Sequence, residues 1–291
     1  MPRPSERGRR RETVFVLGAG KVGTALARAL RRAGAKVTLR PARRGLPRAI
    51  DADVVVLAVR DRDLRPTAEA LVGVVARRAV VVHVAGALDA SPLSPLRAFG
   101  ACAGVAQMHP MISFASTRFA PDLARGNVHV QGDPAAVTRA RRLARLLGMT
   151  PRTVPGLDTV AYHAAAGLVA NGAAALAAVG AELLVKAGVP RADAAKMLGP
   201  LLRSVADNIE KLGFPGALTG PVRRGDAAGV EKHLSTLRAK LPAAVVLYLA
   251  AAQAQLPLAR ALGDAPAASF DEVVAVLDRA AREPPLPAAP R

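Results

Sequence analysis

Three glycines near the start of the chain are spaced as in a turn that binds the pyrophosphate of a dinucleotide. Gly18, Gly20 and Gly23 directly follow the apolar residues 14–17, and a helical pattern comes next. The first glycine permits a tight turn, the second lets a phosphate approach the backbone, and the third lets helix and strand pack closely. Free N–H groups at the start of the helix attract the anion. We therefore predict cofactor contacts at Gly18, Ala19, Gly20, Lys21, Val22 and Gly23.

Three arginines follow the second predicted strand, residues 35–39, where the adenosine ribose lies in this kind of fold. An acidic side chain there holds the 2′-hydroxyl of NAD, whereas arginine accommodates the 2′-phosphate of NADP. No Asp or Glu occurs between residues 36 and 50. Arg40, Arg43 and Arg44 therefore favour NADP. The alternative is that they are solvated loop residues in an arginine-rich chain.

A histidine and an amide in the second half of the chain share one face of a predicted helix. His163, Gly167 and Asn171 are spaced four residues apart. Glycine inside a helix costs about 1 kcal/mol relative to alanine, which suggests that a ligand or a neighbouring helix needs the space. We predict that His163 donates a proton and that Asn171 holds a carbonyl oxygen or carboxamide. A His and an Asn that hydrogen-bond between helices are the alternative.

A constrained loop at residues 218–226 is the second place where helix-forming residues are interrupted. Asp226 can cap the next helix, which carries His233 on the same face. Arg224 could grip a carboxylate through two parallel hydrogen bonds. We predict that Thr219, Arg224, Asp226 and His233 bind substrate, and a helix cap with surface arginines is the alternative.

The elements that position these residues alternate between strand and helix in the first half. Apolar strands are predicted at 53–59, 79–86 and 105–108, followed by a strand at 127–132 and a helix at 134–147. This alternation predicts a Rossmann α/β domain with a doubly wound, mainly parallel sheet, whose ligands bind at the carboxyl ends of the strands. The residues predicted there are Ala58, Val59 and Gly86 for the cofactor, and His83 and His109 for the substrate.

The second half reads as all-α after a Pro- and Gly-containing stretch at 151–156 that we interpret as a linker. Helical patterns cover 158–188, 191–212, 227–262 and a short stretch at 270–281. A break is expected at Pro242. The predicted parts are a disordered basic tail (1–11), an NADP-binding Rossmann domain (12–154), a helical substrate and dimerisation domain (155–282) and a disordered tail (283–291).

The net charge of +19 is the composition feature that most resembles nucleic-acid binding. The charge is mostly arginine scattered among alanines, and aromatic residues make up only 3%, so a stacking platform is missing. No uninterrupted apolar stretch of roughly 18 residues is apparent. The single cysteine, Cys102, suits a reducing compartment. We expect a cytoplasmic homodimer that acts on a small molecule, with no nucleic acid, membrane or metal.

Together these motifs resemble a bacterial family that joins a Rossmann-like N-terminal domain to a helical C-terminal domain of unknown function. Where that family usually has serine, this chain has Ala85 and Ala170, and Arg60 replaces a proline. The matching parts are the glycine turn, residues 83–86, His109-Pro110 followed by Phe114, His163 with Asn171, and the 218–226 loop with His233.

The architecture also resembles pyrroline-5-carboxylate reductase, ketopantoate reductase, prephenate dehydrogenase and the 3-hydroxyisobutyrate dehydrogenase group. In those proteins a helical domain closes over the nicotinamide and often dimerises. The resemblance implies NADP-linked hydride chemistry in an interdomain cleft, and we expect reduction of a small carbonyl compound, a 2-oxo acid such as ketopantoate. Two rivals stay open: an imine reductase of the pyrroline-5-carboxylate type, and a non-catalytic NADP-binding sensor or partner protein.

Overall fold

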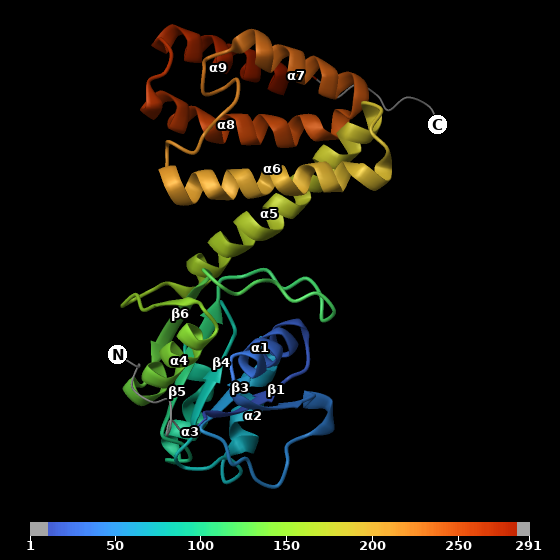
Figure 1. Ribbon diagram of the computed structural model, residues 1–291. Helices are drawn as coiled ribbons and strands as arrows, with labels where there is room; N and C mark the ends of the chain where they lie inside the picture. The colour runs from blue at the N-terminus through green and yellow to red at the C-terminus, as the bar shows by residue number, and fades with distance from the viewer. Residues whose placement is uncertain (1–10, 284–291) are drawn as a thin grey trace, which may run out of the picture. The chain divides into compact units, whose positions relative to one another are not determined.

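The computed structural model describes residues 11–283 and divides the chain into two compact units at Ala170 and Asn171 (Figure 1). The division falls within helix α5 (Thr159–Lys186), later than the predicted boundary at 154. The reason is that the first turns of α5 contact the sheet domain, as when the Thr159 hydroxyl donates to the Ala87 carbonyl at 3.1 Å. The predicted tails, 1–11 and 283–291, lie almost wholly outside the described residues.

The first unit contains a seven-stranded sheet of order β2-β1-β3-β4-β5-β6-β7. Neighbouring strands pair in parallel except β5 and β6, which are antiparallel. This confirms the predicted fold class. One strand, β7, lies in the predicted linker, because three residues with a central proline carry no readable alternation. The strands are β1 (Thr13–Leu17), β2 (Lys36–Arg40), β3 (Val54–Leu57), β4 (Val80–His83), β5 (Gly104–Pro110), β6 (Asn127–Gly132) and β7 (Thr150–Arg152).

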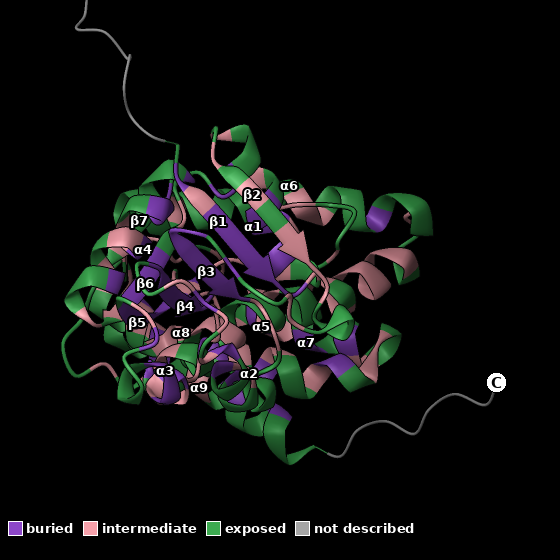
Figure 2. Ribbon diagram, turned by 90° about the horizontal axis from the view of Figure 1, so that it is seen from below, coloured by how far each residue is buried: buried purple, intermediate pink, exposed green. Residues whose placement is uncertain are grey.

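Helices cover both faces of the sheet because its central strands are apolar on both sides. Helices α1 (Lys21–Arg32) and α4 (Pro134–Leu146) share one hydrophobic core with alternate residues of β1, β3 and β4. Helices α2 (Leu64–Leu71) and α3 (Ser94–Ala98) share a second core on the other face of the sheet, with the intervening residues of the same three strands. Figure 2 shows β1, β3 and β4 buried, whereas the edge strand β2 is only partly so. Short 3-10 turns lie at η1 (Ala42–Arg44), η2 (Asp61–Asp63) and η3 (Ser91–Leu93).

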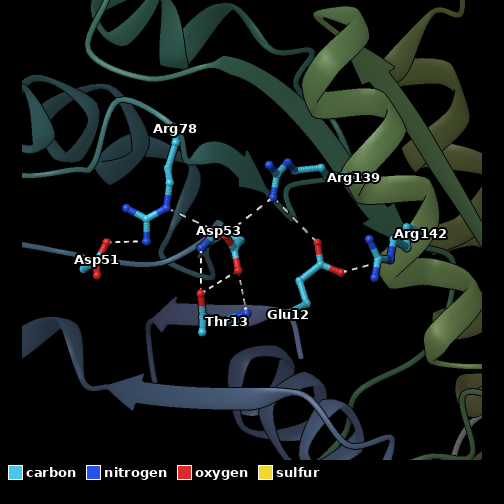
Figure 3. Close-up of polar contacts among 7 residues, drawn as sticks. All are labelled: Glu12, Thr13, Asp51, Asp53, Arg78, Arg139 and Arg142. Atoms are coloured by element: carbon cyan, nitrogen blue, oxygen red, sulfur yellow. Dashed lines mark hydrogen bonds and ion pairs between the residues drawn. The ribbon is translucent and has the colours of Figure 1, made fainter. Parts of the chain in front are cut away.

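A network of charged side chains fixes the amino-terminal edge of this sheet (Figure 3). The Oδ2 atom of Asp53 accepts hydrogen bonds from the Thr13 N–H at 3.0 Å and the Thr13 hydroxyl at 2.7 Å, which joins β3 to β1. Glu12 is almost buried and lies 3.4 Å from the Nε atom of Arg142 on α4. The network therefore ties α4 to the sheet at the edge opposite the glycine turn.

The second unit is helical, as predicted. It comprises the rest of α5, α6 (Arg191–Leu212), α7 (Ala227–Lys240), α8 (Val245–Leu262) and α9 (Ala267–Arg282). The turn η4 (Pro242–Ala244) breaks the third stretch at the predicted proline. The core of this unit consists of residues from α7, α8 and α9 and from the loop that precedes α7. In contrast, α5 has no buried residue and α6 has only Ala194.

Two segments of the described chain are long and apolar enough to span a membrane, Thr159–Lys186 and Pro242–Leu262. They meet this criterion by mean hydropathy, whereas the sequence expectation concerned an uninterrupted apolar run, which Asn171 interrupts in α5. Helices in the core of a soluble protein can be equally long and apolar, and Pro242–Leu262 contributes to the core of its unit.

Candidate active site

The glycine turn joins β1 to α1 at the carboxyl edge of the sheet. Gly18 has a φ of 110°, and a Cβ there would lie 2.2 Å from the Ala58 carbonyl oxygen, so only glycine fits. A Cβ at Gly23 would lie 1.9 Å from the Gly18 carbonyl oxygen. At Gly20, in contrast, no atom beyond the two adjoining residues lies within 4 Å of the place where a Cβ would stand. The packing of the protein thus requires two of these glycines, and the third keeps the turn open.

The N-terminus of α1 begins at this open position. Gly20 is its N-cap, no side chain caps the helix, and its first turn has no acidic residue. The first N–H groups of a helix have no partner within the helix and attract anions. The Thr24 hydroxyl donates to the Ala19 carbonyl at 3.1 Å and steadies the turn. These features fit a bound pyrophosphate.

A hollow of about 410 Å³ lies between η1 and the start of α2, with Leu17, Leu46 and Pro66 among its lining residues. Its apolar lining fits an adenine ring.

The three predicted arginines at and after the end of β2 differ in what they do. The Arg40 guanidinium donates to the carbonyls of Gly45 at 2.6 Å and Arg44 at 2.7 Å, so it braces the loop and is not free for a phosphate.

The side chains of the other two arginines, Arg43 and Arg44, are exposed. Within residues 11–283 they make no side-chain hydrogen bond or ion pair. Both are therefore available to a phosphate.

A second hollow of about 320 Å³ opens at the carboxyl ends of β3, β4 and β5, entirely within the first unit. It brings together several residues that the sequence places far apart. Predicted cofactor and substrate residues among its lining are Val22, Ala58, Val59, Gly86, His109 and His163. Asp61 also lines it and is exposed.

Gly86 allows two imidazole rings to approach the same point. A Cβ at Gly86 would lie 2.2 Å from the Nδ1 atom of His163 and 2.7 Å from the Nε2 atom of His109. The two ring centroids are 5.6 Å apart, with an interplanar angle of 76°. Since His163 is exposed and His109 is half-buried, the ring of His163 is the more accessible to solvent.

The electrostatic surroundings keep His109 neutral. Burial, with a smaller contribution from the neighbouring histidines, lowers the pKa of His109 to about 4. Its Nδ1 atom lies 3.2 Å from the hydroxyl of Tyr162. Burial also raises the pKa of Tyr162, so the phenol keeps its proton. Tyr162 was not predicted as a site residue.

His83 is not at the pocket surface, although we predicted it there. It is fully buried, its Nε2 atom lies 2.6 Å from the Asp89 carbonyl, and its Nδ1 atom accepts the Ala85 N–H at 3.2 Å. It therefore stabilises the turn after β4 from the interior of the domain. The chain folds back over the end of β4 there, which no local pattern indicates.

A buried glutamine fixes the same turn from β5. The Gln107 amide donates to the carbonyls of Ala85 at 2.9 Å and Gly86 at 3.3 Å, and its Oε1 atom lies 3.0 Å from the Nδ1 atom of His129. Neither residue was singled out from sequence. Their signal was a polar side chain inside an apolar strand, which burial makes costly unless it is hydrogen-bonded.

The predicted residues of the second unit lie around the start of α7. The Asp226 Oδ1 atom accepts the Gly229 N–H at 2.8 Å, which confirms the predicted cap. His233 lies 3.0 Å from the Tyr248 hydroxyl. Arg224, Thr219 and Asn171 are exposed. That these residues bind or act on a substrate stays a prediction.

The arginine that braces the loop before α7 is Arg223. It donates to Asp264 at 2.6 Å and to the Leu218 carbonyl at 2.7 Å. The neighbouring Arg224 donates its backbone N–H to the Pro221 carbonyl at 3.1 Å, and its side chain is exposed.

The strand order, the glycine turn and the hollows at one sheet edge define a protein with a Rossmann dinucleotide-binding fold, followed by a helical unit. Residues 127–255, from β6 to within α8, match the family described as "Domain of unknown function (DUF2520)". The match confirms the predicted resemblance to a Rossmann-like family with such a helical region. A comparison with curated proteins finds no match.

Solved structures share the fold over most of the chain. A candidate NADP oxidoreductase from Bacteroides fragilis is 20% identical, with a TM-score of 0.65, over 85% of this chain and 98% of that one. Protein TM1727 from Thermotoga maritima is 23% identical, with a TM-score of 0.61 and the same coverage. Pyrroline carboxylate reductase from Plasmodium falciparum, with NADP bound, is 12% identical, with a TM-score of 0.57, over 88% of this chain and 100% of that one. The chain thus has the fold of NADP oxidoreductases.

Proposed function

We propose that the protein is an NADP(H)-dependent oxidoreductase that reduces a small carbonyl substrate of the 2-oxo acid type, such as ketopantoate. One observation carries the proposal: an open glycine turn and two imidazoles that converge above Gly86 lie at the same edge of one sheet. The first suits the pyrophosphate of a dinucleotide, and the second suits proton transfer to a reacting oxygen.

The chain's own residues would hold the cofactor in three places. Backbone N–H groups of the turn bind the pyrophosphate, the hollow beside η1 receives the adenine, and Arg43 and Arg44 receive the 2′-phosphate. Reduced nicotinamide, when bound, supplies a hydride to an electrophilic carbon. Ala58, Val59 and Gly86 have small side chains or none near this position, which leaves room for a ring.

His163 would supply the proton that the reduced oxygen needs. Its Nδ1 atom faces the space above Gly86, and its exposed ring recovers a proton from solvent afterwards. We expect His163→Ala to lower kcat by about 100- to 10,000-fold, the usual contribution of a positioned acid. The dissociation constant for NADPH would stay unchanged. Full turnover in this variant would contradict the assignment.

A substrate carboxylate needs a cationic side chain as its anchor. The side chains that line the pocket include no Lys or Arg within the described chain. We propose Arg224 for this role, with Thr219, Asp226 and His233 shaping its loop and Asn171 holding the carbonyl oxygen. Replacing Arg224 by Ala would raise the KM for a 2-oxo acid at least tenfold and leave the KM for an uncharged carbonyl unchanged.

Reduction of an imine is a second candidate function. The carboxylate of Asp61 is the charged carboxyl group among the residues lining the pocket, and a carboxylate stabilises a cationic iminium. A panel of 2-oxo acids and cyclic imines, followed by NADPH oxidation, separates the two reactions.

Nucleotide binding is the first experiment. NADPH and NADH are titrated by fluorescence against wild type, Arg43→Ala/Arg44→Ala and the control Arg32→Ala/Arg145→Ala, which removes two exposed arginines elsewhere. We expect the site variant to bind NADPH at least about tenfold more weakly, with NADH unaffected, because charge-assisted hydrogen bonds to phosphate are lost. If wild type bound neither nucleotide, the proposed function would be wrong.

We also propose that the protein forms a homodimer through α5 and α6. These helices expose large apolar side chains, including Leu168 (77% exposed), Val169 (70%) and Leu201 (57%). Extended exposed apolar surfaces mark interaction sites. A second copy can cover them with the same faces around a two-fold axis.

A further inference from the structure

We infer that Tyr162 locks His109 in the neutral tautomer that carries its hydrogen on Nε2, and that this hydrogen is offered to the reacting atom of the substrate. The site then takes a substrate with an acceptor oxygen, a carbonyl, rather than a protonated imine. This inference rests on the proposed function and chooses between its two substrate classes.

The two nitrogens of His109 face different surroundings. Nδ1 lies 3.2 Å from the Tyr162 hydroxyl, whereas Nε2 lies 2.7 Å from the point above Gly86 where a Cβ would stand. Gly86 and His109 both line the pocket. Within residues 11–283, Nε2 makes no hydrogen bond. One end of the ring is therefore held by the protein, and the other end is open to a ligand.

The ring carries a single hydrogen at neutral pH. Burial is the main reason for its low pKa of about 4, and the groups that also act on it are His163, His129 and His83. In a neutral imidazole one nitrogen donates and the other accepts, and the hydrogen bond at one nitrogen decides the state of the other.

The Tyr162 hydroxyl decides the tautomer. A phenol is a good donor and a weak acceptor, whereas an unprotonated imidazole nitrogen is a good acceptor. The hydroxyl therefore donates to Nδ1, and the hydrogen of the ring stays on Nε2. The tyrosine ring is itself fixed, because its centroid lies 5.5 Å from the centroids of both His109 and His129.

The backbone that carries Tyr162 is also held firmly. The Asp158 Oδ1 atom accepts the N–H groups of Val160 at 2.9 Å and Ala161 at 3.0 Å, which caps the start of α5. The Thr159 hydroxyl ties the same turn to the Ala87 carbonyl. Tyr162 is thus a positioning residue whose support does not depend on a ligand.

The consequence for specificity follows from donor and acceptor matching. A carbonyl oxygen accepts the Nε2 hydrogen, and this hydrogen bond strengthens as negative charge develops on the oxygen. The nitrogen of a protonated imine carries a hydrogen of its own, so two donors would meet without an acceptor. His163 remains the proton donor, and His109 keeps its hydrogen throughout.

Nitrogen NMR of the histidine-labelled full-length protein, without cofactor or substrate, tests the tautomer directly. His109→Gln assigns the signals. We expect Nδ1 of His109 to be an acceptor and Nε2 to be protonated at pH 7, and Tyr162→Phe to produce a mixture of tautomers. The control Tyr248→Phe removes the hydroxyl that lies 3.0 Å from His233, and it should leave the His109 signals unchanged. A hydrogen on Nδ1 in wild type would overturn the inference whatever the protein reduces.

Turnover tests the specificity. We expect Tyr162→Phe to lower kcat for a 2-oxo acid about 2- to 10-fold, the range for one neutral hydrogen bond, with KM and NADPH affinity unchanged. Better turnover of cyclic imines than of 2-oxo acids, with Nε2 protonated, would overturn the choice of substrate class. Turnover of neither class would refute the proposed function and leave the tautomer measurement standing as a separate result.

Discussion

Gly86 is the position where one added methyl group should damage the reaction far more than the fold. In Gly86→Ala the new Cβ would start 2.2 Å from the Nδ1 atom of His163 and 2.7 Å from the Nε2 atom of His109, whereas ordinary contacts begin at 3.4 Å. Both contacts are shorter than 3.0 Å, so both rings must move, and His163, which is the closer, must retreat by about 1 Å or more. Because His163 is exposed, its ring can turn into solvent, and the free energy of unfolding should fall by less than about 1–3 kcal/mol, the range for overpacking a closed core.

The chemical effect of that retreat is larger. Misplacing a catalytic group by about 1 Å costs roughly 100-fold in rate. We therefore expect kcat/KM for carbonyl reduction to fall about 100-fold in Gly86→Ala. Urea unfolding and NADPH-dependent turnover are measured on the same preparation.

The matched control is Gly199→Ala on α6, where no atom lies within 4 Å of the new Cβ apart from the adjoining residues and the backbone of the helix itself. It should keep full activity. Because Pro200 follows directly and disfavours a residue with a Cβ in the helical region, the usual gain in helix stability over glycine is not expected. Unchanged turnover in Gly86→Ala would refute the reasoning that the two imidazoles act at this point.

Three further outcomes are expected. Because the pKa of His109 is lowered from 6.5 to about 4, the unfolded chain takes up the proton first as the pH falls, so stability should decline between these values, by about 3 kcal/mol for the full shift. Urea unfolding of wild type and His109→Gln at several pH values would isolate this contribution. If the free energy of unfolding depended on pH equally in both proteins, the prediction would be contradicted. Asp53→Ala should cost about 2–4 kcal/mol because Asp53 is nearly buried and hydrogen-bonded, whereas the exposed Asp51 should cost far less. Light scattering should show a dimer that Leu201→Lys converts to a monomer, while Phe99→Lys, at a still more exposed apolar residue of the first unit, leaves the dimer intact. A monomeric wild type would contradict the proposed interface.

The parts of the fold that sequence predicted well are those with a strong local pattern. Strand β6 and helix α6 begin and end where their patterns predict, and the break at Pro242 is where a proline must interrupt a helix. The boundary inside α5 could not be read in this way. It depends on which turns of one uniform helix meet the sheet, and that is set by tertiary contacts.

The candidate site likewise contains residues that a local motif predicts and residues that only the folded chain brings together. The glycine turn is a local motif, so its residues were found. The approach of His109 to His163 joins β5 to α5, and only the folded chain shows it. Tyr162 was overlooked beside His163, because a tyrosine in an apolar helix looks like an ordinary packing residue until its hydroxyl partner is known.

Helix α5 carries Tyr162 and His163 in its first turns and runs on across the boundary between the two units. A fragment that ended at Ala170 would keep only about three turns of it, below the length at which isolated helices persist in water. Such a fragment would retain every residue of the glycine turn and of the imidazole pair, but contacts at the start of α5, such as that of Thr159 with the Ala87 carbonyl, would have to hold the shortened helix in place. We therefore expect a chain divided at this point to keep nucleotide binding more readily than catalysis, because only the second depends on how firmly α5 is held.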